Sequence, residues 1–409
     1  MQSNEALMEP GGTAWRAAER RRLIEFAERS VLPSGGFAWL DEDGRPDSSH
    51  PLYLWINARM THVFGLEALH FGSERARAIA QGGIRVLADA FEDPVNGGWF
   101  EAVSADGAPV DATKAAYGHS FVVLAAATGV AAGLHGAGEL LERALAQVTT
   151  RFWEPGIGAM RERYMLPDWR DEEPYRGANA NMHTVEALLT AAAALGDQDL
   201  AQMALRVAAT VIEGAARATG WRVVEHFDEH WAPIREFNAA NPGDHLRPYG
   251  LTIGHWLEWS RLLTAIEAAV DDPPVWLLEG ATALFANSYR FGWPTDDAIG
   301  CPYTVDYENR PVVDARLFWV SAEAVLAADA LARRTSDALP RRVLPRFWRE
   351  IDGYFVDRQR GAWHSELNAQ GVPASTIWSG KPDVYHAYQA CLFPDLPVGL
   401  GRGPIGGAA

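Results

Sequence analysis

A glycine that opens a short aromatic or apolar stretch recurs along this chain at nearly constant intervals. The six glycines are Gly36, Gly98, Gly158, Gly220, Gly300 and Gly361. They are separated by 62, 60, 62, 80 and 61 residues, so six units of similar length fill the 409-residue chain. Self-similarity at a fixed period is typical of folds that stack one supersecondary unit on the next. The sequence therefore predicts a repeat architecture.

Each unit combines a hairpin with two helices. The glycines lead into turn residues such as Asp43-Gly44 and Asp106-Gly107, which are hairpin signals between short strands. Between the hairpins, alanine, leucine, arginine and glutamate recur at the helical period. This pattern predicts twelve helices in six pairs, over residues 13–30, 54–71, 75–91, 114–132, 136–152, 179–195, 198–217, 250–270, 274–290, 316–334, 340–355 and 384–392.

The number of repeats bears on how the helix pairs are arranged. Single cores usually stop growing near ~250–300 residues, so this chain forms either two domains or one large closed architecture. Six helix pairs can build an open solenoid or a closed ring, and the even repeat number without polar capping repeats favours the ring. We predict an all-α (α/α)6 barrel with short hairpins on one side, as a single domain over residues 13–395. Residues 1–12 and 396–409 are predicted to be loose termini.

Charge and composition exclude several classes of partner. The formal net charge of −17 argues against nucleic acid and anionic membranes. Residues 1–14 show no signal peptide, and the apolar runs are too short to span a membrane. The two cysteines, Cys301 and Cys391, do not make a disulfide framework. We expect a soluble, cytoplasmic protein without a nucleic-acid or membrane partner, and a homo-oligomer is compatible with the sequence.

Two stretches place a histidine and a glutamate three residues apart at the start of a predicted helix: His183 with Glu186, and His255 with Glu258. Residues three apart lie on one face of a helix, and histidine is the side chain best suited to proton transfer near neutral pH. His386 begins a helix in a third repeat. A closed ring would bring the three histidines together. One such histidine alone would more often be a hydrogen-bonded core residue.

Other polar and aromatic residues lie near the starts of other predicted helices. A buried Arg59 would need a carboxylate or substrate oxygens as partners. Tyr117, Asn179, Trp319 and Glu323 take comparable positions, where each can also serve only to hydrogen-bond the helix start. The chain has 16 tryptophans, which either stack on sugar faces or fill the core.

Histidines supported by carboxylates suit sugar isomerisation, which moves a proton from the carbon next to a carbonyl to its neighbour. Glycoside hydrolysis would instead need two carboxylates, for which Glu258 and Glu323 are candidates. A metal site is a third interpretation, since Glu-x-x-His motifs bind metals in helical bundles. The order here is His-x-x-Glu and no acidic cluster surrounds it, so we expect neither a metal nor another cofactor.

Six stretches resemble the N-acylglucosamine 2-epimerase superfamily, and within it the branch of mannose isomerases and sulfoquinovose isomerases. They are residues 54–60, 97–99, 111–114, 175–183, 254–259 and 383–386, which together span nearly the whole chain. The resemblance implies an (α/α)6 barrel that interconverts an aldose and a ketose without metal or nucleotide, through a cis-enediolate.

The resemblance also implies roles for individual residues. It implies that His255 and His386 are the acid/base pair, that His183 acts in opening the sugar ring, and that Arg59 binds substrate hydroxyls and the enediolate. We add Glu258 to this catalytic set as the expected support of His255. The expected substrate-binding residues are Trp55, Tyr117, Asn179, Trp319, Glu323 and Asp383.

The expected substrate is a monosaccharide. Sulfoquinovose isomerases carry glutamines at the places that look like Ser365 and Pro382 here. Losing two amide donors would weaken the grip on a sulfonate, which favours D-mannose to D-fructose, with D-lyxose to D-xylulose as a side activity. The alternatives are sulfoquinovose isomerisation, 2-epimerisation, glycan hydrolysis or lysis on the same barrel, and sugar binding without turnover.

Overall fold

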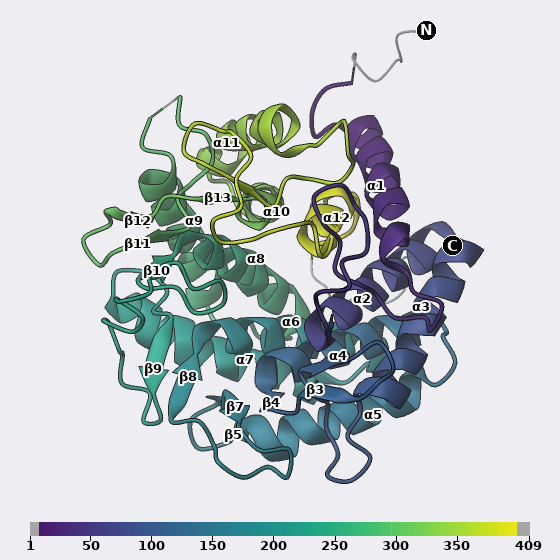
Figure 1. The fold of residues 1–409 in the computed structure, drawn as a ribbon. Coiled ribbons are helices and arrows are strands. Elements are labelled where there is room, and N and C mark those ends of the chain that lie inside the picture. The colour runs from purple at the N-terminus through teal and green to yellow at the C-terminus, as the bar shows by residue number, and fades with distance from the viewer. Residues whose placement is uncertain (1–7, 296, 399–409) are drawn as a thin grey trace, which may run out of the picture.

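A computed structural model describes residues 8–295 and 297–398 and confirms the predicted (α/α)6 barrel. Six inner helices form a ring, and each contacts the next around it (Figure 1). They are α2 (Leu54–Phe71), α4 (Ala116–Ala131), α6 (Ala178–Leu195), α8 (Ile253–Ala269), α10 (Phe318–Arg334) and α12 (Tyr385–Leu392). The inner helices are buried along most of their length, as expected for helices that are apolar on nearly all sides.

Six outer helices pack against the inner ring, one on each inner helix. They are α1 (Thr13–Ala27), α3 (Glu74–Val86), α5 (Ala137–Gln147), α7 (Gln198–Ala208), α9 (Trp276–Gly292) and α11 (Ala338–Glu350). Local signals set several boundaries. Gly72 ends α2 in the left-handed region (φ 63°), where glycine is unstrained, and the side chain of Ser73 then caps α3.

Four outer helices continue into a π-helical turn, which widens the helix by one residue per turn. These turns are Leu87–Phe91, Val148–Phe152, Ala209–Ala216 and Ile351–Phe355. They account for the predicted lengths of 75–91, 136–152, 198–217 and 340–355, which run past the α-helices proper. Three of the turns end on a fully buried phenylalanine, so they anchor the chain before it enters the hairpin.

Short strands precede five of the inner helices. Helix α2 begins at residue 54 as predicted, whereas α4, α6, α8 and α10 begin one to three residues away from their predicted starts. Each of these strands pairs antiparallel with a strand of the hairpin that follows the next outer helix, as β1–β2, β4–β7, β8–β9, β10–β11 and β13–β14. The strands are β1 (Leu52–Tyr53), β2 (Ala102–Val103), β3 (Pro109–Asp111), β4 (Lys114–Ala115), β5 (Trp153–Glu154), β6 (Ala159–Met160), β7 (Arg163–Tyr164), β8 (Tyr175–Gly177), β9 (His226–Asp228), β10 (Leu251–Thr252), β11 (Thr304–Val305), β12 (Pro311–Val313), β13 (Arg316–Leu317) and β14 (Glu366–Leu367).

The fourth residue of three inner helices fastens the helix to its own hairpin. Asn57 accepts a hydrogen bond from the Phe37 N–H, and Asn181 accepts one from the Met160 N–H. His119 takes the same place in α4, where its Nε2 accepts from the Trp99 N–H at 3.0 Å and its Nδ1 bonds the Ala115 carbonyl. The hairpins therefore gather at the end of the ring where the inner helices begin.

The ring closes where the first helix meets the last. In Figure 1 the purple α1 lies beside the yellow α12. Arg20 of α1 and Tyr388 of α12 each donate a hydrogen bond at 2.8 Å to Glu67 of α2. Helix α1 is thus the outer partner of α12, although some 360 residues separate them in the sequence.

The predicted loose termini fall largely outside the described residues, which exclude 1–7 and 399–409. In the described parts, Met8 and Leu396 pack against the core. The single-domain boundary at 13–395 stays a prediction. Over residues 8–295 and 297–398, the structure has no helix with the length and hydropathy that a membrane crossing requires.

Candidate active site

A cavity of about 70 Å³ lies at the hairpin end of the inner ring. It opens into an outer chamber of about 340 Å³, with which it shares Trp55, Tyr117, Asn179, His245 and Leu246. Together the two reach the size usual for small-molecule sites, roughly 300–1,000 Å³. Ten of the eleven predicted site residues line the inner cavity: Trp55, Arg59, Tyr117, Asn179, His183, His255, Glu258, Trp319, Asp383 and His386.

The inner helices contribute these residues in two layers. The second residue of five of the helices forms the upper layer: Trp55, Tyr117, Asn179, Trp319 and His386. The sixth residue, one turn deeper on the same face, forms the lower layer. Arg59, His183 and Glu258 of this layer line the cavity, whereas Phe121 and Glu323 take the same helix position without lining it. The three histidines lie near the starts of their helices but at different positions, because His386 is the second residue of α12, His255 the third of α8 and His183 the sixth of α6.

His255 is held by a carboxylate from a hairpin. Its Nδ1 lies 2.8 Å from Oε2 of Glu225, and Glu225 Oε1 accepts from the Thr252 N–H. Because a carboxylate only accepts, Nδ1 carries the hydrogen and Nε2 is left with its lone pair. The predicted support of His255 by Glu258 is therefore wrong: Glu258 lies 3.7 Å from Nδ1 of His183 instead.

His386 is held in the same way by a different repeat. Its Nδ1 lies 2.9 Å from Oε1 of Glu323, which is fully buried behind the histidine. Burial lowers the pKa of His386 although Glu323 opposes the shift. Glu323 was predicted to contact substrate, but it is not among the residues that line the cavity. Its place is that of a residue that orients His386.

Trp319 lies between the two held histidines. Its ring centroid is 5.4 Å from that of His255 and 5.7 Å from that of His386. The neighbouring Gly254 leaves room for the indole, because a Cβ there would lie 2.4 Å from two of its ring atoms. The tryptophan thus sets the spacing of the two imidazoles on one side of the cavity.

Arg59 and His183 form the opposite side of the cavity. Arg59 donates to Asp383 at 3.2 Å and to the Tyr117 hydroxyl at 2.9 Å. Burial would lower the pKa of Arg59, but Tyr117 and Asp383 raise it above its ordinary value. His183 lies against Tyr117, and burial lowers its pKa to about 3. This side therefore offers a fixed cation beside a neutral imidazole.

Three glutamates converge on one guanidinium beneath the cavity. Arg261 donates to Glu323 at 2.8 Å and lies 3.5 Å from both Glu186 and Glu258. Two sets, His183 with Glu186 and Glu258, and Glu258 with Glu323 and His386, have their ligand-type atoms within 4.8 Å of one another. In both sets the positive charge that a metal ion would bring is already supplied by Arg261. The donor set does not favour a metal.

The sequence model of the N-acylglucosamine 2-epimerase (GlcNAc 2-epimerase) family matches residues 35–390. The chain belongs to this family.

Relatives of the chain in this family have recorded activities. A D-mannose isomerase of Thermobifida fusca is 46% identical over 386 residues, 94% of each chain. One of Pseudomonas cannabina pv. alisalensis is 42% identical and covers 96% of this chain and 94% of its own. A crystal structure of D-mannose isomerase is similar, with a TM-score of 0.86 at 27% identity over 93% of this chain and 97% of that chain. A cellobiose 2-epimerase from Spirochaeta thermophila has a TM-score of 0.81 at 23% identity over 93% of this chain and 95% of that chain, and shows the fold alone.

Sequence reasoning missed two contributors to the site of this family member. Glu225 follows its repeat glycine by five residues, just as Glu101 and Glu162 follow theirs by three and four. These glutamates accept from the N–H groups of Thr252, Ala115 and Gly177, which precede the inner helices. Aligning the hairpins as well as the helices would have revealed Glu225.

The second missed contribution comes from a loop. His245 and Leu246 line the cavity and follow the fourth hairpin. The fourth repeat is 80 residues long against about 61 for the others, and this excess was the available signal. The loop also brings His245 to Trp378, with ring centroids 5.2 Å apart.

The two positions that separate this chain from the sulfoquinovose isomerase pattern both line the cavity. Ser365 donates a hydrogen bond at 2.6 Å to the Gly380 carbonyl, and Pro382 follows shortly after. The Ser365 hydroxyl hydrogen is thus used within the protein, and Pro382 has no side-chain donor. Neither residue supplies the amide donors expected at a sulfonate site.

Proposed function

We propose that this protein is a cofactor-independent D-mannose isomerase that interconverts D-mannose and D-fructose. The observation that carries the proposal is the pair His255 and His386, which line one cavity, each with Nδ1 on its own buried carboxylate. D-mannose isomerases at 46% and 42% identity over nearly the whole chain support the substrate. D-lyxose to D-xylulose is the expected side activity.

The two imidazoles suit both halves of the proton transfer. With Nδ1 held, each ring presents Nε2 as the atom that accepts or donates a proton. In the open-chain aldose one histidine takes the C2 proton, the electron pair forms the C1–C2 double bond, and O1 becomes an enediol oxygen. Delivery of a proton to C1 and transfer of the O2 proton to O1 then give the ketose, with a carbonyl at C2 and a hydroxyl at C1. The glutamates stabilise each histidine when it is cationic.

Arg59 supports the same reaction from the opposite side of the cavity. Its guanidinium is already fixed by Asp383 and Tyr117 before substrate binds. A preorganised cation stabilises negative charge that develops on O1 and O2 without having to reorganise. His183, a neutral imidazole at the same wall, is the proposed residue for opening the sugar ring. Trp55, Tyr117, Asn179, Trp319 and Asp383 are the proposed substrate contacts.

The proposal is tested by turnover in heavy water. The enzyme, treated with EDTA, is incubated with D-mannose in D₂O, and the products are analysed by NMR. We expect D-fructose with deuterium at C1 and full activity after chelation. Deuterated D-glucose labelled at C2 would identify a 2-epimerase instead, and activity restored only by added metal would contradict a metal-independent site.

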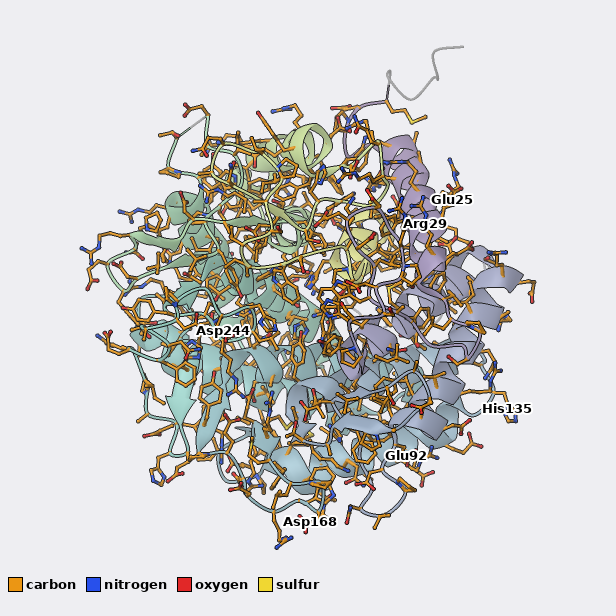
Figure 2. All side chains as sticks on the ribbon, in the orientation of Figure 1. Glu25, Arg29, Glu92, His135, Asp168 and Asp244 are labelled. Carbon is orange, nitrogen blue, oxygen red and sulfur yellow. The ribbon has the colours of Figure 1, made fainter. Side chains whose placement is uncertain are left out.

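Two variants locate the activity in the cavity. His255→Asn is expected to lose about 10²- to 10⁴-fold in kcat, the range for removing a general acid or base. His135→Asn is the matched control, because His135 is exposed and lies at the edge of the molecule, away from the ring interior that side chains fill (Figure 2). Equal activity of the two variants would sink the proposal. Cleavage of mannooligosaccharides that needs Glu258 would support a hydrolase.

The cytoplasmic location and a homo-oligomer stay predictions.

A further inference from the structure

Arg261 of α8 occupies the centre of the ring, directly beneath the catalytic cavity. It does not line that cavity but lines a second one of about 280 Å³ among the far ends of the inner helices. It is 5% exposed, and the three glutamates around it are 0–1% exposed. The guanidinium therefore lies in the layer that separates the two cavities.

The three glutamates around Arg261 are not equally supplied with hydrogen bonds. Glu323 accepts from Arg261 Nε and bonds His386. Glu186 accepts from the Tyr385 hydroxyl and from Gln389. Hydrogen bonds of this kind stabilise an ionised carboxylate. Each of these two glutamates is thus built to stay charged.

Glu258 differs from the other two. Within the described residues, its Oε1 has no hydrogen-bond partner, and neither has Nδ1 of His183 or Nη2 of Arg261. Glu258 Oε1 is 3.7 Å from the histidine nitrogen and 3.5 Å from the arginine nitrogen. Three buried polar atoms from three residues thus meet without hydrogen bonds. The guanidinium can only donate, so a hydrogen on the Glu258 carboxyl group has His183 Nδ1 as its nearest acceptor in this gap. The same histidine nitrogen is also 3.7 Å from Oε2 of Glu186.

The charges around Arg261 also favour a proton on Glu258. Three ionised carboxylates around one arginine would leave two uncompensated negative charges in a buried site, and neighbouring buried carboxylates do not all ionise. We propose that Arg261 is a positioning residue of the isomerase, which keeps Glu186 and Glu323 ionised and leaves Glu258 protonated towards the cavity. The catalytic part of this inference rests on the proposed function, whereas the protonation pattern does not.

Charged or titratable groups surround Glu258 from all six inner helices. The titratable or charged groups are Arg59 from α2, Tyr117 from α4, His183 and Glu186 from α6, Arg261 from α8 itself, Glu323 from α10, and Tyr385 and His386 from α12, with Asp383 just before it. Burial, with Glu323 and Glu186, raises the pKa of Glu258 well above its ordinary value against the pull of Arg261. For Glu323 the effect of burial is outweighed by Arg261 and His386, which lower its pKa.

The arrangement gives Arg261 two effects on the reaction. An ionised Glu323 keeps the Nδ1 hydrogen on His386 and so leaves Nε2 as the proton acceptor. A neutral Glu258 places an O–H donor in a cavity wall that also contains His183. Without the guanidinium, Glu323 would bind a proton at higher pH and would no longer hold His386.

Infrared spectroscopy of the sugar-free protein tests the protonation pattern. The difference spectrum of wild type minus Glu258→Gln is recorded at about pH 8.5. Burial raises the pKa of Glu101 to about 7, and at a pH more than one unit higher this second buried carboxyl group is ionised and adds no band of its own. We expect a carbonyl band of a protonated carboxyl group that shifts in D₂O. Its absence would overturn the assignment of the proton to Glu258, whether or not the enzyme isomerises mannose.

Kinetics of Arg261→Met test the positioning role. We expect kcat to fall about 10- to 100-fold with little change in KM, and the acidic limb of kcat/KM to move to higher pH. Arg261→Lys should recover part of both effects. The matched control is Arg176→Met, which removes another buried arginine, one that pairs with Glu154 and Glu172. The positioning role of Arg261 would be overturned if the acidic limb moved equally in Arg261→Met and Arg176→Met, or in neither. If Arg261→Met does not fold, the position of the acidic limb in Arg261→Lys provides the test.

Discussion

The two acid/base candidates owe their direction to glutamates that do not line the inner cavity. A free imidazole can carry its hydrogen on either nitrogen, whereas a carboxylate at Nδ1 fixes the hydrogen there and leaves Nε2 as the reactive atom. Glu225 and Glu323 do this for His255 and His386 from two different repeats. At the scale of the residue, the proposed catalytic unit is therefore a histidine together with its glutamate.

The first prediction concerns Glu225. Glu225→Gln is expected to lower kcat about 10- to 100-fold, since a hydrogen bond to a charged group is worth ~1.5–3 kcal/mol and 1.36 kcal/mol is a factor of ten. The KM for D-mannose should change little, because Glu225 does not line the inner cavity. Steady-state kinetics measure both constants. A variant in which only KM rises would show that Glu225 serves binding.

The second prediction concerns the pH dependence of His386. Its pKa is below the ordinary value of ~6.5 because the ring is buried, so it stays a neutral base as the pH falls through 6.5. The acidic limb of kcat/KM is therefore expected below that pH. Glu323 raises the pKa of His386, so Glu323→Gln should lower kcat and move the limb further down. A limb that moves upward in Glu323→Gln would contradict this assignment.

Positions near the helix starts, together with the family resemblance, identified ten of the residues around the cavity but not their pairing. Residues three apart on a helix share a face, yet His255 is third and Glu258 sixth in α8, so the glutamate lies about one turn deeper. At that depth it meets His183 from α6, while Glu225 reaches His255 from the hairpin. Such contacts between repeats depend on hairpin register, which the periodicity of a single helix does not contain.

At the scale of the element, the size of the second residue of an inner helix limits how closely a side chain of the next inner helix can pack against it. Gly254→Ala is expected to displace Trp319, because the new Cβ would lie 2.4 Å from its ring. We expect kcat/KM to fall about tenfold or more, as for other small misplacements near reacting groups, and the unfolding free energy to fall by ~1–3 kcal/mol from overpacking.

The matched control is Gly138→Ala in α5, where a Cβ would meet nothing within 4 Å. Alanine is the better helix former by about 0.5–1 kcal/mol, so this variant should be slightly more stable and fully active. The changes in unfolding free energy of the two variants, measured with urea, should therefore have opposite signs, and only Gly254→Ala should lose activity. Equal destabilisation of both would show that the helices, and not the indole, respond to the extra methyl group.

The hairpin clamps give a prediction on pH and stability. Burial lowers the pKa of His119 to about 3, below the unfolded value of ~6.5. The unfolded chain therefore binds more protons between these values, so the stability that His119 provides is complete above pH 6.5 and is lost as the pH falls towards 3. His119→Asn should cost ~0.5–3 kcal/mol at neutral pH, because it removes the buried imidazole that packs against Trp99 and Phe152.

The asparagine does not titrate, so the difference between His119→Asn and the wild type should shrink below pH 6.5, by up to ~1.4 kcal/mol per pH unit. Urea unfolding at several pH values measures this change. His135→Asn, at an exposed position, should show no such trend. A constant difference for His119→Asn would mean that His119 is charged in the folded protein.

The helices themselves were predicted well because their apolar period is long and regular. The π-helical turns at the ends of α3, α5, α7 and α11 were not, since one extra residue hardly disturbs that period. The pairing of α1 with α12 was also out of reach, because helical periodicity says which face is buried but not against which partner. The even repeat number indicated only that the ring closes.

At the scale of the whole molecule, the seam between the first and last repeats is a target for mutation. Tyr388→Phe removes one of the two donors to the buried Glu67. We expect the unfolding free energy to fall by ~1.5–3 kcal/mol, the value of a hydrogen bond to a charged group, with kcat unchanged because Tyr388 does not line the cavity. Loss of kcat without loss of stability would show that the seam acts on the active site directly.

The seam also determines when the enzyme can first work. Arg59 and Asp383 bond each other across 324 residues of chain, and His386 comes near the end. A nascent chain folds from its N-terminus as it leaves the ribosome, so five repeats can assemble before the cation of the cavity meets its carboxylate. The apolar inner faces of α2 and α10 must wait for α12 during that time. Activity is thus a property of the finished polypeptide, and chains cut short by a few dozen residues would be both inert and prone to associate.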